Sequence, residues 1–188
     1  KSGEIVLDLG CGPGLWTHML AEKVKPDGRI IGLDSNRAFL NYALKNNKKG
    51  QFKKIVEFHE GNFYSLPFEK ETFDLVLFGN CISYVKEYQK VLKEQKRVTK
   101  KGGRIAVRDF EGSVLVIHPI EPLLTMKVLT AAAQALKDNP PDPFFDNFPG
   151  QKLRGHLVKA GLKKISCFSY AVHAVPPLTS EEKRYIIG

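Results

Sequence analysis

Short apolar segments alternate along the chain with stretches in which apolar residues recur at helical spacing. The apolar segments have the length and composition of buried strands, and they cover residues 5–9, 29–33, 54–60, 73–78 and 104–108. The helical stretches between them cover residues 15–24, 35–47 and 86–100. Because repeated β-α-β alternation with short connections favours parallel pairing, we predict an α/β fold with a doubly wound, mostly parallel sheet.

Each predicted helix carries an apolar face that we expect to pack on the sheet. In the first helix these residues are Leu15, Met19, Leu20 and Val24. In the second, which we expect Ser35 to cap, they are Phe39, Leu40, Ala43 and Leu44. In the third they are Tyr88, Val91, Leu92 and Val98. We expect this third helix to end in a left-handed turn at 101–103.

The pattern changes after Phe110, where residues 111–150 form a long, apolar, proline-containing insertion. We expect a helix over 122–138 and an ordered loop over 139–149 within it. A helix over 152–160 closed by Gly161, a strand over 162–175 and a helix opened by Thr179 and Glu182 follow. We predict a single domain over 1–188 with trimmed termini, whose insertion covers a ligand site or closes the sheet edge as core.

Composition is that of an ordinary globular domain, with 43% hydrophobic and 26% charged residues. No apolar run approaches the roughly 20 residues that a membrane-spanning helix needs. Three cysteines, Cys11, Cys81 and Cys167, lie far apart without CxxC spacing. This usage argues against a disulfide framework and a zinc site, so we predict no metal and a cytoplasmic location.

The formal net charge of +9 is compatible with an anionic partner such as RNA. The lysines, however, gather at residues 45–54 and 93–104, around predicted helix ends and turns. Such charge runs are usually solvated surface, so nucleic-acid binding is not favoured and remains an alternative.

The most informative motif is a glycine loop between the first strand and the first helix. Gly10, Gly12 and Gly14 let the backbone turn tightly and approach a ligand closely. Asp34 ends the second strand, where an acid in nucleotide-binding sheets accepts hydrogen bonds from ribose hydroxyls. The loop and this acid together predict a ligand that contains a ribose.

Two details separate this loop from dinucleotide and phosphate-binding loops. The third glycine of a dinucleotide fingerprint would fall at Leu15, which opposes a nicotinamide dehydrogenase, and no Gly-Lys-Ser/Thr sequence follows. Asp8 precedes the loop, where a carboxylate repels a pyrophosphate but suits a cation. The expected ligand therefore carries a ribose, an adenine and a cationic group.

In these features the chain resembles the class I S-adenosylmethionine-dependent methyltransferases, within the type 11 group related to ubiquinone/menaquinone methyltransferases. The resemblance covers residues 4–174 and rests on ordered motifs at 8–14, 34, 61–63, 73–85, 100–104 and 158–162. It implies a Rossmann-like methyltransferase fold and S-adenosyl-L-methionine as the cofactor.

The resemblance also implies a role for each residue that matches a family motif. The loop at Gly10, Cys11 and Gly12 would hold the methionine part of the cofactor, and Asp8 would support its ammonium group. Asp34 would take the ribose hydroxyls, and Ser35 would flank the adenine. Asn62, Phe63, Gly79 and Ile82 complete the implied cofactor site. Asn62 stands where the family usually has an acid, and Gly61-Asn62 is also a good turn pair.

The resemblance further implies a small-molecule acceptor, which we expect to be apolar or aromatic if the insertion lines its pocket. The candidate catalytic residues are Asp109, His118 and Tyr84, which follow the later strands or lie in the insertion. Many relatives carry paired histidines where this chain has Ser83-Tyr84. Trp16 is expected to face the sheet as core, and Cys11 to be a small filler. The alternatives are an RNA methyltransferase and a non-catalytic cofactor-binding subunit.

Overall fold

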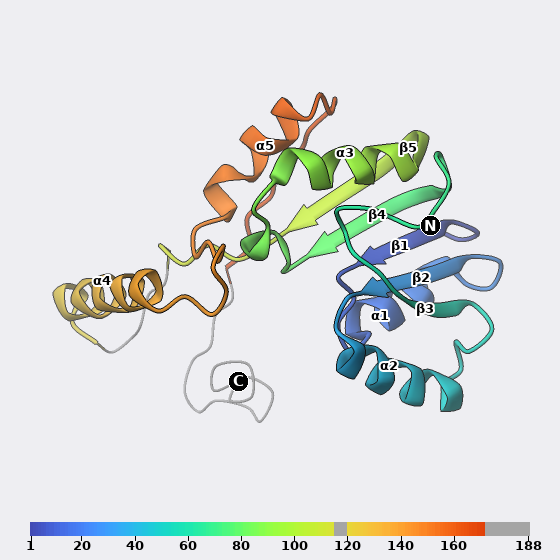
Figure 1. Cartoon of the computed structure of the whole chain (residues 1–188), viewed down its shortest axis with the longest axis horizontal. Helices are drawn as coiled ribbons and strands as arrows, with labels where there is room; N and C mark the ends of the chain where they lie inside the picture. Colours follow the sequence, from blue (N-terminus) through green and yellow to red (C-terminus); the bar gives the residue numbers. More distant parts are fainter. Residues whose placement is uncertain (115–119, 172–188) are drawn as a thin grey trace.

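The predicted parallel sheet is present in the computed structural model, which describes residues 1–114 and 120–171 (Figure 1). Its strands are β1 (Ile5–Leu9), β2 (Arg29–Asp34), β3 (Val56–Glu60), β4 (Phe73–Gly79) and β5 (Thr99–Arg108). They lie in the order β3-β2-β1-β4-β5, and every neighbouring pair is parallel. β2 and β3 lie on one side of β1, whereas β4 and β5 lie on its other side. The order of the strands therefore switches between β1 and β4, which is where such sheets bind ligands.

The helices that flank the sheet are α1 (Leu15–Val24), α2 (Arg37–Lys49), α3 (Tyr88–Val98) and the short α5 (Leu153–Lys159). Side chains alternate along β1, so Val6 packs with Ala21 and Val24 of α1, whereas Leu7 belongs to the core shared with Val91 of α3. The two faces of the sheet thus have separate cores, as expected of a doubly wound fold.

The expected inward face of α1 is only partly correct. Leu15 is 67% exposed and Met19 is 52% exposed, whereas Thr17 and Ala21 are buried with Val24. The buried face runs instead through Thr17, Ala21 and Val24, and Thr17 is drawn inward because its hydroxyl bonds to the carboxylate of Asp8.

The cap of the second helix and the start of the third strand differ from the predicted ones. Asn36, rather than Ser35, caps α2, because its side-chain oxygen accepts hydrogen bonds from the backbone amides of Ala38 and Phe39. On that helix Leu40 and Ala43 are buried, but Phe39 and Leu44 are exposed. β3 begins at Val56 rather than at residue 54.

The third helix ends earlier than expected. It stops at Val98, and the left-handed turn at Gly102 (φ 79°) lies inside β5 as an irregularity in its pairing with β4. Its predicted apolar face is confirmed, with Val91, Leu92 and Val98 buried. Helix and strand therefore meet directly, and the glycine turn serves as a bulge in the strand.

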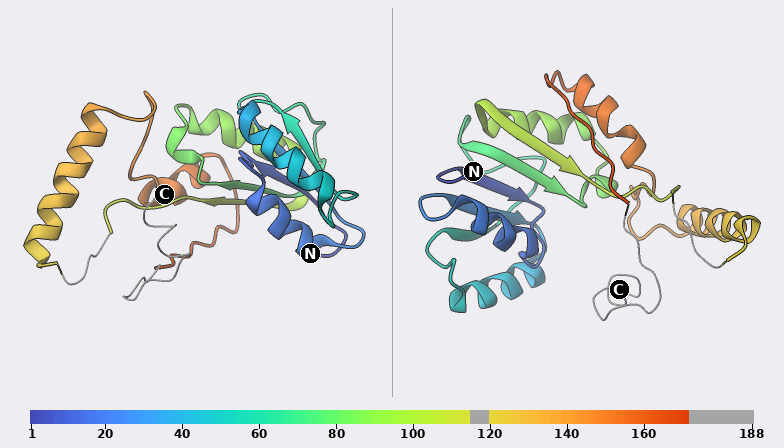
Figure 2. Two further views of the ribbon diagram at one scale, coloured as in Figure 1. Left: turned by 90° about the horizontal axis from the view of Figure 1, so that it is seen from below. Right: turned by 180° about the vertical axis from the view of Figure 1, so that it is seen from behind.

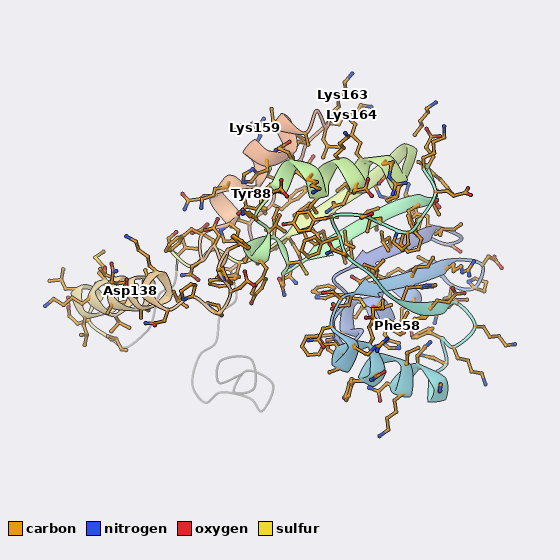
Figure 3. The ribbon with its side chains drawn as sticks, in the orientation of Figure 1. Phe58, Tyr88, Asp138, Lys159, Lys163 and Lys164 are labelled. Carbon is orange, nitrogen blue, oxygen red and sulfur yellow. The ribbon has the colours of Figure 1, made fainter. Side chains whose placement is uncertain are left out.

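The insertion folds into α4 (Pro122–Asp138), which stands apart from the sheet in both views of Figure 2. Asp138, the last residue of α4, lies far from the sheet (Figure 3). Leu123, Leu124 and Met126 are exposed, so of the two alternatives for the insertion, closure of the sheet edge as core is wrong for these residues. The expected loop over 139–149 contains no helix or strand, and a 3-10 turn, η2 (Gly150–Lys152), leads into α5.

The strand expected over 162–175 is not formed in its described part, because residues 162–171 adopt no strand. Residues 172–175, His118, His173, Thr179 and Glu182 lie outside the described residues. Gly161 does follow α5 with a positive φ of 70°, as predicted. No helix in the described part of the chain is long and apolar enough to cross a membrane.

Candidate functional site

The loop between β1 and α1 needs its glycines for backbone conformation. Gly10, Gly12 and Gly14 have φ values of 70°, 53° and 89°, which residues other than glycine rarely adopt. The backbone amides of Gly10 and Cys11 both donate to the carbonyl of Leu33 on β2, at 2.7 and 3.1 Å. The loop is thus fastened to the neighbouring strand, and it turns beyond the carboxyl end of the sheet.

Asp34 contacts the same loop from the end of β2. Its Oδ2 accepts a hydrogen bond from the Gly12 amide at 2.7 Å, and its Oδ1 accepts one from the Asn36 amide at 2.8 Å. Because each carboxylate oxygen has two acceptor positions, both can still accept hydrogen bonds from a ligand. The structure therefore brings the glycine loop and the predicted ribose-binding acid together.

The loop also leaves room for a ligand. A Cβ built on Gly12 would meet no heavy atom within 4 Å, whereas one on Gly10 would collide with the Cys81 thiol. The face of the loop at Gly12 is therefore open, and the face at Gly10 is packed against Cys81, which follows β4. An open, left-handed backbone beside the carboxylate that is predicted to bind a ribose fits the cofactor that the sequence predicts.

Asp8 lies beneath this loop and is 2% exposed. Burial, the largest cause, and the charge of Asp34 together raise the pKa of Asp8 to about 6. A 2.6 Å hydrogen bond from the Thr17 hydroxyl opposes the shift. A cation beside this buried group would stabilise its charged form, which is compatible with the predicted role of Asp8.

The two cysteines at the loop, Cys11 and Cys81, have raised pKa values, which disfavour the reactive thiolate. Burial is the main cause that raises the pKa of Cys11, in accord with its predicted role as filler. Burial likewise raises the pKa of Cys81 to about 12, and its thiol donates to the Gly79 carbonyl at 3.2 Å. Gly79 thus ends β4 with a carbonyl at the same edge as the glycine loop.

Asn62 forms a turn in this structure. Its side-chain oxygen accepts a hydrogen bond from the Tyr64 amide at 2.8 Å, the turn interaction that the sequence left open. Phe63 packs edge-on against Phe78, with ring centroids 5.7 Å apart. Ser35 is exposed after β2, and Ile82 is buried after β4.

The predicted catalytic candidates that the structure describes lie at the ends of β4 and β5. Asp109 accepts hydrogen bonds from the backbone amides of Ser83, at 3.2 Å, and Phe110, at 2.9 Å. It therefore joins the two loops that follow these strands. Tyr84 is half-exposed, and its ring lies 5.2 Å from that of Phe145.

Trp16 occupies a different place from the one expected. It is half-buried, and the Arg108 guanidinium lies 4.8 Å from its ring centroid. Arg108 ends β5, so this stacked pair bridges α1 and β5 at the carboxyl edge of the sheet. Sequence reasoning did not pair the two residues, because nothing local connects positions so far apart in the chain.

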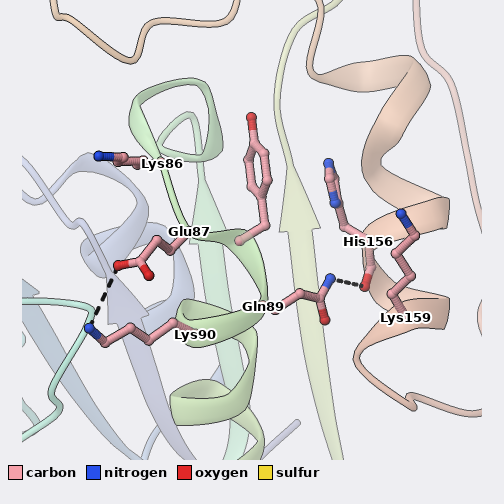
Figure 4. Close-up of a pocket in the computed structure, with 7 residues that line it drawn as sticks. Lys86, Glu87, Gln89, Lys90, His156 and Lys159 are labelled. Atoms are coloured by element: carbon pink, nitrogen blue, oxygen red, sulfur yellow. Dashed lines mark hydrogen bonds and ion pairs between the residues drawn. The ribbon is translucent and has the colours of Figure 1, made fainter.

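A separate groove of about 480 Å³ lies between the start of α3 and α5 (Figure 4). Lys86, Lys90 and Lys159 line it, and Lys90 pairs with Glu87. Lys159 lies near Lys163 and Lys164 at one corner of the molecule (Figure 3). This basic groove is not formed by any residue of the glycine loop.

Residues 1–157 match the sequence model of a family described as a methyltransferase domain. The chain belongs to this methyltransferase family. The demethylmenaquinone methyltransferase of Bacillus cereus is 32% identical over 93% of this chain and 77% of its own length. That of Lactococcus lactis is 43% identical over 62% of this chain. The chain spans 46% of the length of this Lactococcus relative.

Solved structures agree with this assignment. A SAM-dependent methyltransferase from Aquifex aeolicus is similar with a TM-score of 0.58 and 25% identity, over 71% of this chain and 72% of that chain. One from Methanosarcina mazei has a TM-score of 0.66 at 20% identity, over 85% and 80% of the two chains, and supports the fold alone. The predicted fold, enzyme class and cofactor, S-adenosylmethionine, are confirmed at the level of the family.

Proposed function

We propose that this methyltransferase domain transfers the methyl group of S-adenosylmethionine to the ring of a quinol, a small aromatic acceptor of the menaquinone type. The observation that carries the cofactor part is the Asp34 carboxylate bonded to the open glycine loop at Gly12. The acceptor part rests on the demethylmenaquinone methyltransferases among the relatives.

The cofactor roles follow from where each residue lies. The loop at Gly10, Cys11 and Gly12 would hold the methionine part, and the buried carboxyl of Asp8 would favour the ammonium group. Asp34 would accept the ribose hydroxyls. The remaining contacts are assigned to Ser35, Asn62 and Phe63 around the adenine, and to Gly79 and Ile82 beside the methionine part.

The cofactor, when bound, supplies a methyl group that is already activated on a sulfonium. The protein then has to align the acceptor in line with that methyl group and keep water out. Asp109 accepts two backbone amide bonds, so we assign it to orient the loops after β4 and β5. Tyr84 reaches the same edge and is the candidate for direct contact with the acceptor, and His118 stays a sequence prediction.

The test is a pair of measurements on the full-length protein. S-Adenosylhomocysteine should raise the midpoint of thermal unfolding, whereas NAD should not, since a ligand at 100 times its Kd stabilises by about 2.7 kcal/mol. A demethylated naphthoquinol should then gain one methyl group, seen by mass spectrometry. A shift with NAD alone would contradict the cofactor assignment, and a shift without methylated product would contradict the acceptor assignment.

A cytoplasmic location and the absence of nucleic-acid binding are separate proposals. The scattered cysteines support the location, because exposed Cys167 and buried Cys11 are free thiols. RNA binding that weakens steeply with salt would contradict the second proposal.

A further inference from the structure

Three aromatic side chains meet beyond the carboxyl ends of β4 and β5. Tyr84 ends the 3-10 turn η1 (Ile82–Tyr84) that follows β4, and Phe110 follows β5. Phe145 comes from the loop after α4, and its ring centroid lies 5.2 Å from that of Tyr84 and 6.4 Å from that of Phe110. Segments far apart in sequence thus place three rings in one cluster.

The cluster leaves much of its surface uncovered. Tyr84 is 46% exposed and Phe110 is 44% exposed, while Phe145 lies half-buried between them. The Phe110 and Phe145 rings are nearly parallel, with an interplanar angle of 28°, so a further planar ring can continue the same stacked arrangement. Exposed aromatic surface favours such stacking, because it removes apolar area from water.

A short segment holds Phe145 in this place through Asp146. The Asp146 amide donates to the Ser83 carbonyl at 2.8 Å, next to Tyr84. Its carboxylate accepts hydrogen bonds from Lys152, at 2.6 Å, and from the Tyr88 hydroxyl, at 3.3 Å. Asp146 therefore ties the loop that carries Phe145 to the turn after β4 and to the start of α3.

Three further contacts brace this segment. The His156 ring stacks on Tyr88, with centroids 4.0 Å apart, and the Gln89 side chain donates to the His156 carbonyl at 3.2 Å (Figure 4). At the other side, the Glu111 carboxylate accepts from the Gln151 amide at 3.0 Å. These contacts hold the segment that carries Phe145 against the turn after β4, against α3 and against Glu111, so the fold itself keeps Phe145 in place.

From these contacts we propose that Tyr84, Phe110 and Phe145 form the platform on which the acceptor's planar ring stacks, with Asp146 as the residue that positions Phe145. This inference rests on the proposed function and goes beyond it, because it names the residues that select an aromatic acceptor. Tyr84 lies two residues after Ile82, which is assigned to the cofactor site. Because Ile82 and Tyr84 share the turn η1, a ring on this platform would lie beside the assigned cofactor site.

The chain offers a matched control one residue away. Phe144 is also half-exposed, but its ring contacts the Lys86 ammonium, at 4.8 Å, rather than the cluster. Phe145→Leu and Phe144→Leu remove the same aromatic ring from adjacent positions. A general loss of apolar surface affects both variants, and loss of the platform affects only the first.

Binding is measured first, because it needs no turnover. The probe is a naphthoquinone in which both carbons of the quinone carbon–carbon double bond carry methyl groups, so that the exposed Cys167 thiol cannot add to it. We expect Phe145→Leu to weaken its binding about tenfold and Phe144→Leu to leave it within twofold, with S-adenosylhomocysteine affinity unchanged in both. Equal affinities in the two variants, or no binding by the unmodified protein, would overturn the platform.

Two substitutions of Tyr84 distinguish a role of its ring from a role of its hydroxyl group. Tyr84→Phe keeps the ring and should keep acceptor binding, whereas Tyr84→Leu should weaken it about tenfold.

Asp146→Ala should raise the acceptor KM more than it lowers kcat, while S-adenosylhomocysteine binding stays unchanged, as expected of a positioning residue. An Asp146→Ala variant with unaltered acceptor KM would remove its assigned role.

The outcomes also separate this inference from the proposed function. If the probe binds in a manner that depends on Phe145 but no quinol is methylated, the platform stands and the quinol assignment fails. If quinol is methylated and the acceptor KM of Phe145→Leu equals that of Phe144→Leu, the function stands and the platform fails.

Discussion

The carboxylate of Asp34 lies 2.7 Å from the backbone nitrogen of Gly12, so the acid that ends β2 is bonded to the loop that follows β1. The two strands are neighbours in the sheet, with Leu9 of β1 paired to Leu33 of β2. One carboxylate therefore both shapes the loop and faces the space that the loop leaves open.

Replacing Asp34 should abolish tight cofactor binding. Asp34→Ala loses the acceptor for ribose hydroxyls and the bond to Gly12, and hydrogen bonds to a charged group contribute about 1.5–3 kcal/mol each. We expect S-adenosylhomocysteine affinity to fall about 100-fold by calorimetry. Asp27→Ala, in an exposed turn, is the control and should bind as the unmodified protein does. Unchanged affinity in Asp34→Ala would contradict its assignment to the ribose.

Alanine substitutions at Gly10 and Gly12 should have different effects. Both glycines have a positive φ, which costs an alanine about 1–2 kcal/mol. In Gly12→Ala the new methyl group points into open space, so the protein should stay folded but lose cofactor affinity. In Gly10→Ala it collides with the Cys81 thiol, so the melting temperature should fall much further. Equal melting temperatures for the two variants would be the contrary result.

Asp8 should make stability depend on pH. Its pKa rises from 3.8 to about 6 on folding, so folding favours the protonated form. That contribution is complete below about pH 4 and is lost as pH rises through 6, by about 3 kcal/mol. Asp8→Asn should remove this loss, so its stability relative to the unmodified protein should increase between pH 4 and 7. Denaturant titrations across this interval measure the difference.

Cofactor binding should release a proton through the same group. An ammonium beside Asp8 favours the carboxylate, so S-adenosylhomocysteine should bind more tightly at pH 7 than at pH 5. Calorimetry in buffers of different ionisation enthalpy detects the released proton. If Asp8→Asn shows the same pH profile, another group binds the ammonium.

Gln95 should be a site where the protein can be stabilised. It is fully buried in α3, and neither atom of its side-chain amide has a hydrogen-bond partner among the described residues. Gln95→Met keeps the volume and removes an unsatisfied amide, which should raise the free energy of unfolding by about 1–2 kcal/mol. Gln89→Met removes an amide that is bonded to His156, so it should bring no gain. A lower denaturation midpoint for Gln95→Met would contradict this account.

The sheet could be predicted because its signals are local. Continuous apolar runs specify strands buried on both faces, and the glycines before Leu15 and the acid at Asp34 stand directly at the ends of strands. Boundaries were less certain, because Ser35 and Asn36 are both good caps. Only the direction of the Asn36 side chain selects between them.

The later part of the chain could not be predicted in the same way. Leu123, Leu124 and Met126 form an apolar pattern that indicates burial, yet α4 stands away from the sheet. Residues 162–171 have the alternation of a strand but adopt none. The spacing of apolar residues indicates which side chains a segment can bury, but not which other segment it packs against. Strand formation depends on that partner.

By itself, the sequence determined the order of the elements, the parallel sheet and the cofactor loop. These depend on backbone conformation and on periods of a few residues, which local chemistry controls. Tertiary structure alone decided that Asp34 bonds to Gly12, that Arg108 stacks on Trp16, and that Phe145 meets Tyr84. Such contacts join residues distant in the chain, and only the packing of the sheet and its loops brings them together.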